Sequence, residues 1–177
     1  MDQIALIGLP GSGKSTVGKL LAEQMTLPFV DLDSVIEDEA GLSIVDIFGT
    51  FGEQGFRQRE AKALVDVASF SEQRGCVLAT GGGIVVTKEC RDLLSQQWFT
   101  VYLNASVNTL VHRLASEREH RPLLAGNDEL LERVSRLYGE RRQYYTSTAQ
   151  IVVNVDHLAP GQVAECILAA HHRTQTL

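Results

Sequence analysis

Residues 8–15 of the chain read GLPGSGKS, and this short stretch restricts the possible folds more than any other. An apolar run over residues 3–8 leads into it, as expected for a buried strand. Apolar residues at helical spacing follow from Lys14 onwards. The stretch fits the pattern G-x-x-x-x-G-K-[ST] at every fixed position. A strand, a glycine-rich loop and a helix in this order predict a nest of backbone N–H groups that binds phosphate.

The residues of this loop have different expected roles. Glycine lets the backbone fold around an anion without obstruction by a Cβ atom. Lys14 is expected to bring its charge to the β- and γ-phosphates of a nucleotide, and Ser15 to offer an oxygen to Mg²⁺. The other nucleotide-binding residues expected here are Gly11, Ser12, Gly13 and Thr16, of which Thr16 either touches a phosphate or only supports the helix start. A glycine-rich turn with a solvated lysine is the weaker alternative, because a strand and a helix flank the loop.

The rest of the chain alternates short apolar strands with helices. We expect strands at residues 3–8, 29–31, 76–80, 99–104 and 151–156, and helices at residues 14–26, 34–40, 43–51, 54–73, 87–97, 106–115, 128–145 and 160–172. This alternation predicts a three-layer α/β/α fold, with a five-stranded parallel sheet covered on both faces. Residues 116–127 have no clean period and many charges, so we expect a loop there. His171, on the last helix, is expected to be solvated.

Composition argues against several classes of partner. The 177 residues carry a net charge of −6, which disfavours nucleic acid or an anionic membrane as the main partner. No apolar stretch reaches the ~18 residues of a membrane span, and we expect no signal segment, because the first apolar run ends in glycines. The three cysteines are an odd number without metal-ligand spacing, so we expect free thiols in a reducing cytoplasm. We expect one domain over residues 1–177.

Two acids stand at the end of the second predicted strand. Asp31, its last residue, and Asp33 are at i and i+2 at the carboxyl end of the strand, and ligands bind beyond this end in an open parallel sheet. Asp31 could hold Mg²⁺ through water, whereas Asp33 could bind substrate hydroxyls and accept the proton of the attacking one. The alternative is that Asp33 or Ser34 only caps the next helix.

Several motifs together make the chain resemble the shikimate kinase family. They are the loop at residues 8–15, DLD at 31–33, GFRQRE at 55–60, TGGG at 80–83, RPLL at 121–124, and Arg141 followed four residues later by Tyr145. The resemblance covers almost the whole chain and implies a P-loop, nucleoside-monophosphate-kinase-like fold. It implies a helical substrate-binding region near residues 32–60 and a mobile lid near residues 112–126. The implied activity is transfer of the ATP γ-phosphate to the 3-hydroxyl of shikimate in aromatic amino acid biosynthesis, by a cytoplasmic, monomeric enzyme that needs Mg²⁺.

Two arginines are expected to hold the carboxylate of this substrate. A carboxylate favours guanidinium groups, because their planar fork matches two oxygens at once. Arg57 lies on a predicted helix with Glu60 at i+3 to orient it, and Arg141 lies near the end of a later helix. Arg57 could instead form only an intrahelical ion pair. Arg142 is a second candidate for the later position, which the motif spacing assigns to Arg141.

The remaining expected site residues are the glycine triplet and two further arginines. The backbone N–H groups of Gly81, Gly82 and Gly83 could bind substrate oxygens, or the triplet could be a tight turn that only permits helix packing. By resemblance, Arg113 would stack against adenine. Arg121, in the lid, would stabilise charge on the transferring phosphoryl group.

Three other functions stay open at this point. A gluconate kinase, or another kinase of small polyhydroxy acids, would use the same arginines and Asp33. A nucleoside-monophosphate kinase would need more groups to read a base. A non-catalytic, nucleotide-gated binding module would share the fold, although the presence of Lys14, Ser15, Asp33 and Arg121 together argues against it.

Overall fold

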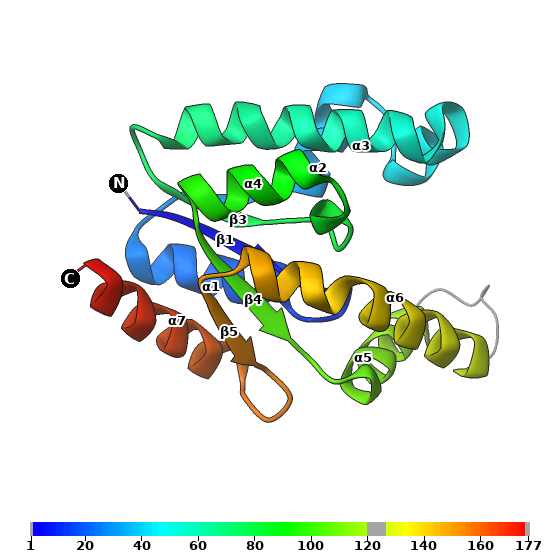
Figure 1. The fold of residues 1–177 in the computed structure, drawn as a ribbon. Coiled ribbons are helices and arrows are strands. Elements are labelled where there is room, and N and C mark those ends of the chain that lie inside the picture. Colours follow the sequence, from blue (N-terminus) through cyan, green and yellow to red (C-terminus); the bar gives the residue numbers. More distant parts are fainter. Residues whose placement is uncertain (1, 120–126, 176–177) are drawn as a thin grey trace.

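The computed structural model of the chain describes residues 2–119 and 127–175, arranged around a parallel sheet (Figure 1). The strands are β1 (Gln3–Ile7), β2 (Phe29–Asp31), β3 (Cys76–Ala79), β4 (Phe99–Asn104) and β5 (Ile151–Asn154). The helices are α1 (Lys14–Met25), α2 (Leu32–Ala40), α3 (Ile44–Ser71), α4 (Lys88–Gln97), α5 (Val107–Glu119), α6 (Asn127–Thr148) and α7 (Pro160–Gln175), with a 3-10 turn η1 (Ile84–Val86). The predicted fold class is therefore confirmed.

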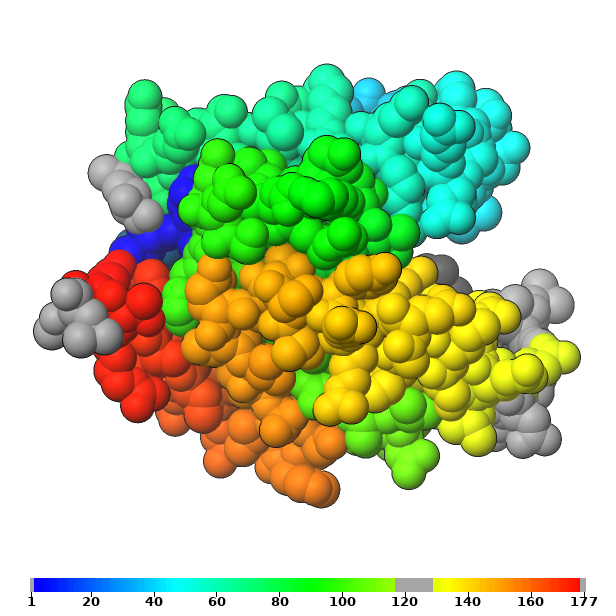
Figure 2. Space-filling view, viewed as in Figure 1, coloured from blue at the N-terminus to red at the C-terminus, as the bar shows by residue number. Residues whose placement is uncertain are grey.

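The strand order β2-β3-β1-β4-β5 distributes the helices over the two faces of the sheet. The chain moves away from β1 to reach β2, then reverses and crosses back through β3 to β4 and β5. Because parallel crossovers are right-handed, this reversal places α1 on the opposite face from α3, α4 and α6. Helix α7 packs beside α1, and α4 contacts α3 and α6 (Figure 1). The space-filling view shows a hollow between the tip of α3 and α6 (Figure 2).

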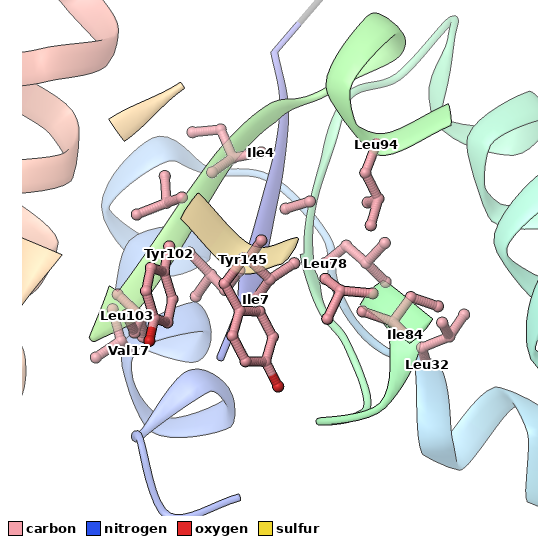
Figure 3. Packing of buried hydrophobic residues seen from close by; sticks show 14 of the residues in the cluster. Ile4, Ile7, Val17, Leu32, Leu78, Ile84, Leu94, Tyr102, Leu103 and Tyr145 are labelled. Atoms are coloured by element: carbon pink, nitrogen blue, oxygen red, sulfur yellow. The ribbon is translucent and has the colours of Figure 1, made fainter. Parts of the chain in front are cut away.

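The core consists of apolar side chains from both faces of the sheet and from the covering helices. Ile4 and Ile7 of β1 and Leu78 of β3 are fully buried, as expected for central strands of a parallel sheet. Figure 3 shows the ring of Tyr145, from α6, beside that of Tyr102, from β4. The two rings are stacked, with centroids 4.9 Å apart and planes at 17°. This stack joins α6 to the sheet and so fixes the helix that carries Arg141.

Several element boundaries differ from the predictions. Helix α2 begins at Leu32, and Asp31 caps it by accepting the backbone N–H of Asp33 at 3.2 Å, so the predicted capping by Asp33 or Ser34 is wrong. The predicted helices at 43–51 and 54–73 are the two halves of α3, which meet at Gly52. Helix α5 continues to Glu119, into the segment predicted as a loop. The rest of that segment, residues 120–126, lies outside the described residues.

Cysteine and histidine predictions have opposite outcomes. The three cysteines are free, as predicted, and burial raises the pKa of Cys76 to about 11 and that of Cys90 to about 12. His171 is buried rather than solvated, with its Nε2 atom 3.0 Å from Oδ1 of Asp2. Within residues 2–119 and 127–175, no helix has the length and apolar character needed to cross a bilayer.

Candidate active site

The glycine-rich loop between β1 and α1 lines a cleft of about 510 Å³. At Gly8 a Cβ atom would stand 2.7 Å from the carbonyl oxygen of Leu103, too close for any side chain. Gly13, which precedes α1, has a φ of 95°, a conformation that side chains strongly disfavour. The loop can therefore curl tightly against β4 and present its backbone to the cleft.

The side-chain amine of Lys14 is buried and contacts the backbone of this loop. Its Nζ atom donates hydrogen bonds to the carbonyl oxygens of Gly8 at 2.9 Å and Leu9 at 3.0 Å. Burial lowers the pKa of Lys14 to about 8, although the negative charges of Asp33 and Asp31 oppose the shift. The amine is thus poised between charged and neutral forms, and an arriving phosphate would favour the charged form.

Ser15 and Asp31 bring two oxygen donors together at the edge of the cleft. The hydroxyl of Ser15 donates a hydrogen bond of 2.8 Å to Oδ2 of Asp31, across the gap between α1 and β2. Hydroxyl and carboxylate oxygens next to a phosphate-binding loop are the donors that Mg²⁺ prefers, with water and phosphate completing its shell. The residues present therefore fit a magnesium ion bound together with a nucleotide.

Asp33 lies in the first turn of α2 and also lines the cleft. Its Oδ1 atom is buried and has no hydrogen-bond partner among the described residues. Burial raises the pKa of Asp33, and the neighbouring charge of Asp31 raises it further. A buried carboxylate oxygen without a partner is costly, which is typical of a group that awaits a ligand. The position of Asp33 suits binding of a substrate hydroxyl.

The glycine triplet after β3 is where the separate parts of the site meet. A Cβ atom on Gly81 would stand 2.7 Å from Oδ1 of Asp33, and one on Gly83 would stand 2.3 Å from Nη2 of Arg57. On Gly82 it would stand 2.6 Å from Cδ of Pro10, in the phosphate loop. The space that side chains here would need is therefore occupied by Asp33, Pro10 and Arg57.

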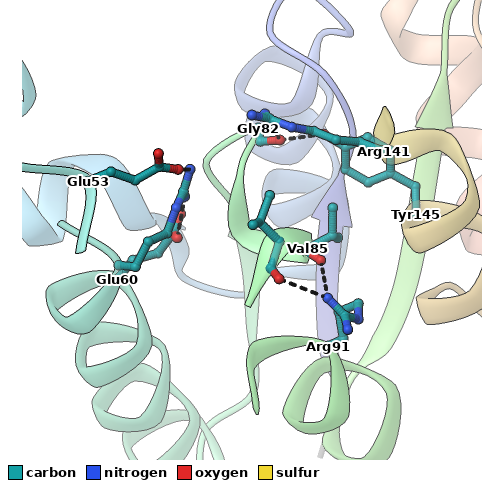
Figure 4. A network of polar contacts seen from close by, with 9 residues as sticks. Glu53, Glu60, Gly82, Val85, Arg91, Arg141 and Tyr145 are labelled. Atoms are coloured by element: carbon teal, nitrogen blue, oxygen red, sulfur yellow. Dashed lines mark hydrogen bonds and ion pairs between the residues drawn. The ribbon is translucent and has the colours of Figure 1, made fainter. Parts of the chain in front are cut away.

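The two predicted substrate arginines both lie close to this triplet, Arg57 against Gly83 and Arg141 at Gly82, and Figure 4 shows the contact of Arg141 with Gly82. Arg57 donates from Nη1 to Oε2 of Glu60 at 2.6 Å, and the Glu60 side chain is fully buried. Arg141 donates from Nη1 to the carbonyl oxygen of Gly82 at 3.0 Å. Arg142 instead lies over the ring of Tyr138, on the same helix. Of the two candidates on α6, only Arg141 reaches the site in this structure.

Arg113 contacts the phosphate loop in this structure. Its Nη1 atom donates to the carbonyl oxygens of Gly11 at 3.2 Å and Ser12 at 3.4 Å. Stacking of Arg113 against adenine stays a prediction. The cleft beside it is lined by apolar groups from the loop after β5 and from α7, namely Val155, Leu158, Pro160 and Val163. Arg121, the expected lid arginine, lies outside the described residues.

The site has two halves that meet at Asp33 and Gly82. Both residues line the cleft together with the phosphate loop, whereas Arg57 and Arg141 do not. The cleft therefore suits a nucleotide, and the two arginines lie outside it. Sequence reasoning missed Glu53, whose Oε1 atom lies 3.4 Å from Nη2 of Arg57. Its i,i+4 spacing to Arg57 was the available signal.

A parallel α/β/α fold with a glycine-rich phosphate loop, a buried lysine and acids at the end of β2 defines the class of P-loop nucleotide-binding proteins. The profile of the shikimate kinase family matches residues 10–172. A shikimate kinase from Marinomonas sp. is 43% identical over 170 residues, which cover 96% of this chain and 92% of the relative. The structure of shikimate kinase from Acinetobacter baumannii in complex with shikimate superposes with a TM-score of 0.88 at 33% identity, covering 98% of this chain and 94% of the other. The chain belongs to the shikimate kinase family.

The predicted alternative of a gluconate kinase is not favoured by these similarities. A gluconokinase structure from Sinorhizobium meliloti has a TM-score of 0.57 at 18% identity, over 98% of this chain and 93% of the other. A likeness at this level reflects the shared fold alone. Kinases of the shikimate kinase family use ATP as the phosphate donor, so this chain is an ATP-dependent kinase.

Proposed function

We propose that this kinase transfers the γ-phosphate of ATP to the 3-hydroxyl of shikimate, giving shikimate 3-phosphate and ADP. The observation that carries the proposal is the placement of Arg57 against Gly83 and of Arg141 at Gly82, in a glycine turn that adjoins the phosphate loop. A carboxylate between two guanidinium groups would hold a small acid there, with its hydroxyls facing Asp33. The relative from Acinetobacter baumannii, solved with shikimate, supports the same ligand.

The nucleotide would bind through the loop and its lysine. The backbone N–H groups of Gly11, Ser12 and Gly13 would cradle the phosphates, assisted by Thr16 at the start of α1. The Lys14 amine would exchange its two carbonyl partners for phosphate oxygens. Because the phosphates bring negative charge, they would keep the amine protonated and centred on the transferring group.

The proposed metal ligands are Ser15 directly and Asp31 through water. Magnesium bound there would supply positive charge to the β- and γ-phosphates. Asp31 would orient the ion's water, while its role as the cap of α2 keeps the carboxylate fixed. The hydrogen bond between Ser15 and Asp31 supports this proposal, because it brings the two side chains within reach of one shared ion.

Asp33 is proposed to orient the acceptor hydroxyl and accept its proton. Because burial raises its pKa, Asp33 is a stronger base than an ordinary carboxylate, yet it remains ionised above that raised value. The N–H groups of Gly81, Gly82 and Gly83 would bind further substrate oxygens. Arg121, carried by a lid over residues 112–126, would add charge to the phosphoryl group while the lid excludes water.

We also propose that the enzyme is a cytoplasmic monomer with small-molecule substrates and no nucleic-acid or membrane partner. The net charge of −6 supports the absence of nucleic-acid and membrane partners, because phosphate backbones and anionic headgroups repel an acidic surface. Sedimentation at several protein concentrations would test the monomer, and a mass that rises with concentration would contradict it.

Release of ADP, measured with shikimate, gluconate and CMP as separate acceptors, tests the proposed function. Of the three acceptors, we expect only shikimate to give rapid release of ADP. The Lys14→Ala variant should release none, although its circular dichroism should match that of the wild type. Calorimetry should show heat when shikimate is added. Turnover with gluconate or CMP but not shikimate, or absence of that heat, would require another substrate.

A further inference from the structure

Tyr145 is the largest fully buried side chain in the part of the chain that the structure describes, yet its polar end reaches the site. Its ring stacks on Tyr102 in the core. Its hydroxyl donates a hydrogen bond to the carbonyl oxygen of Gly82, in the glycine triplet (Figure 4). The residue therefore links the core packing of α6 directly to the backbone on which the acceptor half of the site is built.

The same carbonyl oxygen receives a second donor from the same helix. Nη1 of Arg141, one helical turn before Tyr145, donates to the Gly82 oxygen at 3.0 Å. A carbonyl oxygen has two lone pairs, so these two donors use its full capacity. Arg141 also interacts with the Tyr145 hydroxyl, and because a guanidinium carries five donors, N–H groups of Arg141 remain for a ligand.

The orientation of this carbonyl determines more than its own contacts. The C=O of Gly82 and the N–H of Gly83 belong to one planar trans peptide, in which they point in opposite directions. Gly83 in turn lies against Arg57, whose Nη2 atom is 2.3 Å from the place where a Cβ atom would be. Rotation of this peptide would thus move the Gly83 N–H, change the space that Arg57 occupies, and move the Gly82 oxygen away from Arg141.

We propose that Tyr145 is a positioning residue for the acceptor half of the site. Its hydroxyl holds the Gly82–Gly83 peptide in the one orientation that lets Arg57 and Arg141 engage the same substrate carboxylate. This inference rests on the proposed function, because it assumes an acidic acceptor between the two arginines. Burial raises the pKa of the Tyr145 phenol, so the hydroxyl keeps its proton and stays a donor at any working pH.

Tyr145→Phe tests this inference because it deletes the hydroxyl and keeps the stacked ring. Tyr102→Phe is the matched control, since it removes the hydroxyl of the other ring in the stack. That hydroxyl donates to Oδ1 of Asn104 at 2.9 Å and does not touch the triplet. For Tyr145→Phe we expect the shikimate KM, and the Kd from calorimetry without nucleotide, to rise about threefold to tenfold. The KM for ATP and kcat should stay within about twofold, and Tyr102→Phe should leave all of these constants within that range.

The outcomes separate a positioning role from a structural one. A merely structural tyrosine would lower the melting temperature in both variants without changing the shikimate constants of Tyr145→Phe, and that result would overturn the inference. Equal losses of shikimate affinity in the two variants would overturn it as well. In either case a wild type that phosphorylates shikimate leaves the proposed function intact. A wild-type protein that fails to bind shikimate would overturn both.

Discussion

At the scale of single residues, Arg57 has two carboxylate neighbours with very different exposure. Glu60 is fully buried and lies 2.6 Å from the guanidinium, whereas Glu53 has a side chain that is 66% exposed and lies 3.4 Å away. Removing one partner from a buried pair is costly, but an exposed ion pair contributes little. Glu60 therefore holds Arg57 permanently, and Glu53 is an exchangeable partner that an incoming carboxylate can replace.

Glu53→Gln should accordingly strengthen binding of the acidic substrate. The substitution removes a carboxylate that competes for Nη2 of Arg57, so we expect the shikimate KM to fall about twofold to threefold. The KM for ATP and kcat should not change, as steady-state kinetics will show. Asp66→Asn, which removes an exposed acid from the same helix without contacting Arg57, is the control. A rise in the shikimate KM of Glu53→Gln would mean that Glu53 orients Arg57 instead.

The lowered pKa of Lys14 predicts a pH dependence of nucleotide binding. Below a pKa of about 8 the amine of the free enzyme is charged, and above it the amine becomes neutral and attracts phosphate less. We expect kcat/KM for ATP, which reports on the free enzyme, to fall as the pH rises through about 8. Calorimetry of ADP binding should show the same fall, and Lys14→Met should bind ADP weakly at every pH. A wild-type profile that is flat to pH 9 would contradict this assignment.

At the scale of elements, the glycine triplet depends on pieces that sequence periodicity does not reveal. The turn η1 follows it directly, and Nη1 of Arg91 in α4 donates to the carbonyl oxygens of Val85 at 2.6 Å and Val86 at 3.0 Å. Helix α3 breaks at Gly52, with φ 66° and ψ −177°, just before the segment that carries Arg57. The break separates an exposed tip from a half that is anchored on the sheet. It therefore sets where the helical segment that carries Arg57 begins.

Gly52→Ala should destabilise the protein through backbone strain alone. A Cβ atom at this position would meet nothing within 4 Å, so only the left-handed φ opposes it. We expect the free energy of unfolding to fall by about 1–2 kcal/mol in urea titrations. Gly49→Ala is the control, because a Cβ there also meets nothing within 4 Å but the backbone is helical. That variant should be neutral or more stable by about 0.5–1 kcal/mol, and equal losses in both variants would rule out strain at Gly52.

At the scale of the whole molecule, the site and the chain ends lie at opposite edges of the sheet (Figure 1). Loops after β1, β2 and β3 build the site at the carboxyl edge, as expected for an open parallel sheet. At the other edge, His171 of α7 contacts Asp2, which precedes β1, and packs on the ring of Phe99 at the start of β4. This contact joins α7 to β1, which is the first strand of the chain and the central strand of the sheet. It lies far from the candidate active site.

Asp2→Asn should therefore lower stability without changing activity. The hydrogen bond with His171 lowers the pKa of Asp2, so the ionised carboxylate is favoured in the folded state. Its contribution is complete above the ordinary carboxyl pKa and disappears as the pH falls through the lowered value. Because the Asp2 side chain is 38% exposed, we expect a loss of only about 0.5–1 kcal/mol in urea at pH 7. Asp38→Asn, at an exposed position on α2, should cost less, and an equal loss would contradict a specific contact.

The sequence predicted those features that depend on neighbours along the chain. The loop at residues 8–15 carries its own strand, glycines and helix start, so its conformation follows from local rules. The alternation of strands and helices was enough to predict the parallel three-layer fold. Helix ends were less predictable, because hydrophobic periodicity does not encode them: α5 runs on to Glu119, and the side chain of Asp31 caps α2.

Only the tertiary structure decided which side chains from distant parts of the sequence contact one another. Arg141 and Gly82 are 59 residues apart, and His171 and Asp2 are 169 apart, so no local pattern could pair them. The spacing to Tyr145 favoured Arg141 over its neighbour Arg142, and the structure places Arg141 at the triplet and Arg142 over the ring of Tyr138. Local sequence determines backbone preferences because these depend on a few adjacent residues. Contacts between distant segments depend on how the core packs, and that is a property of the folded chain.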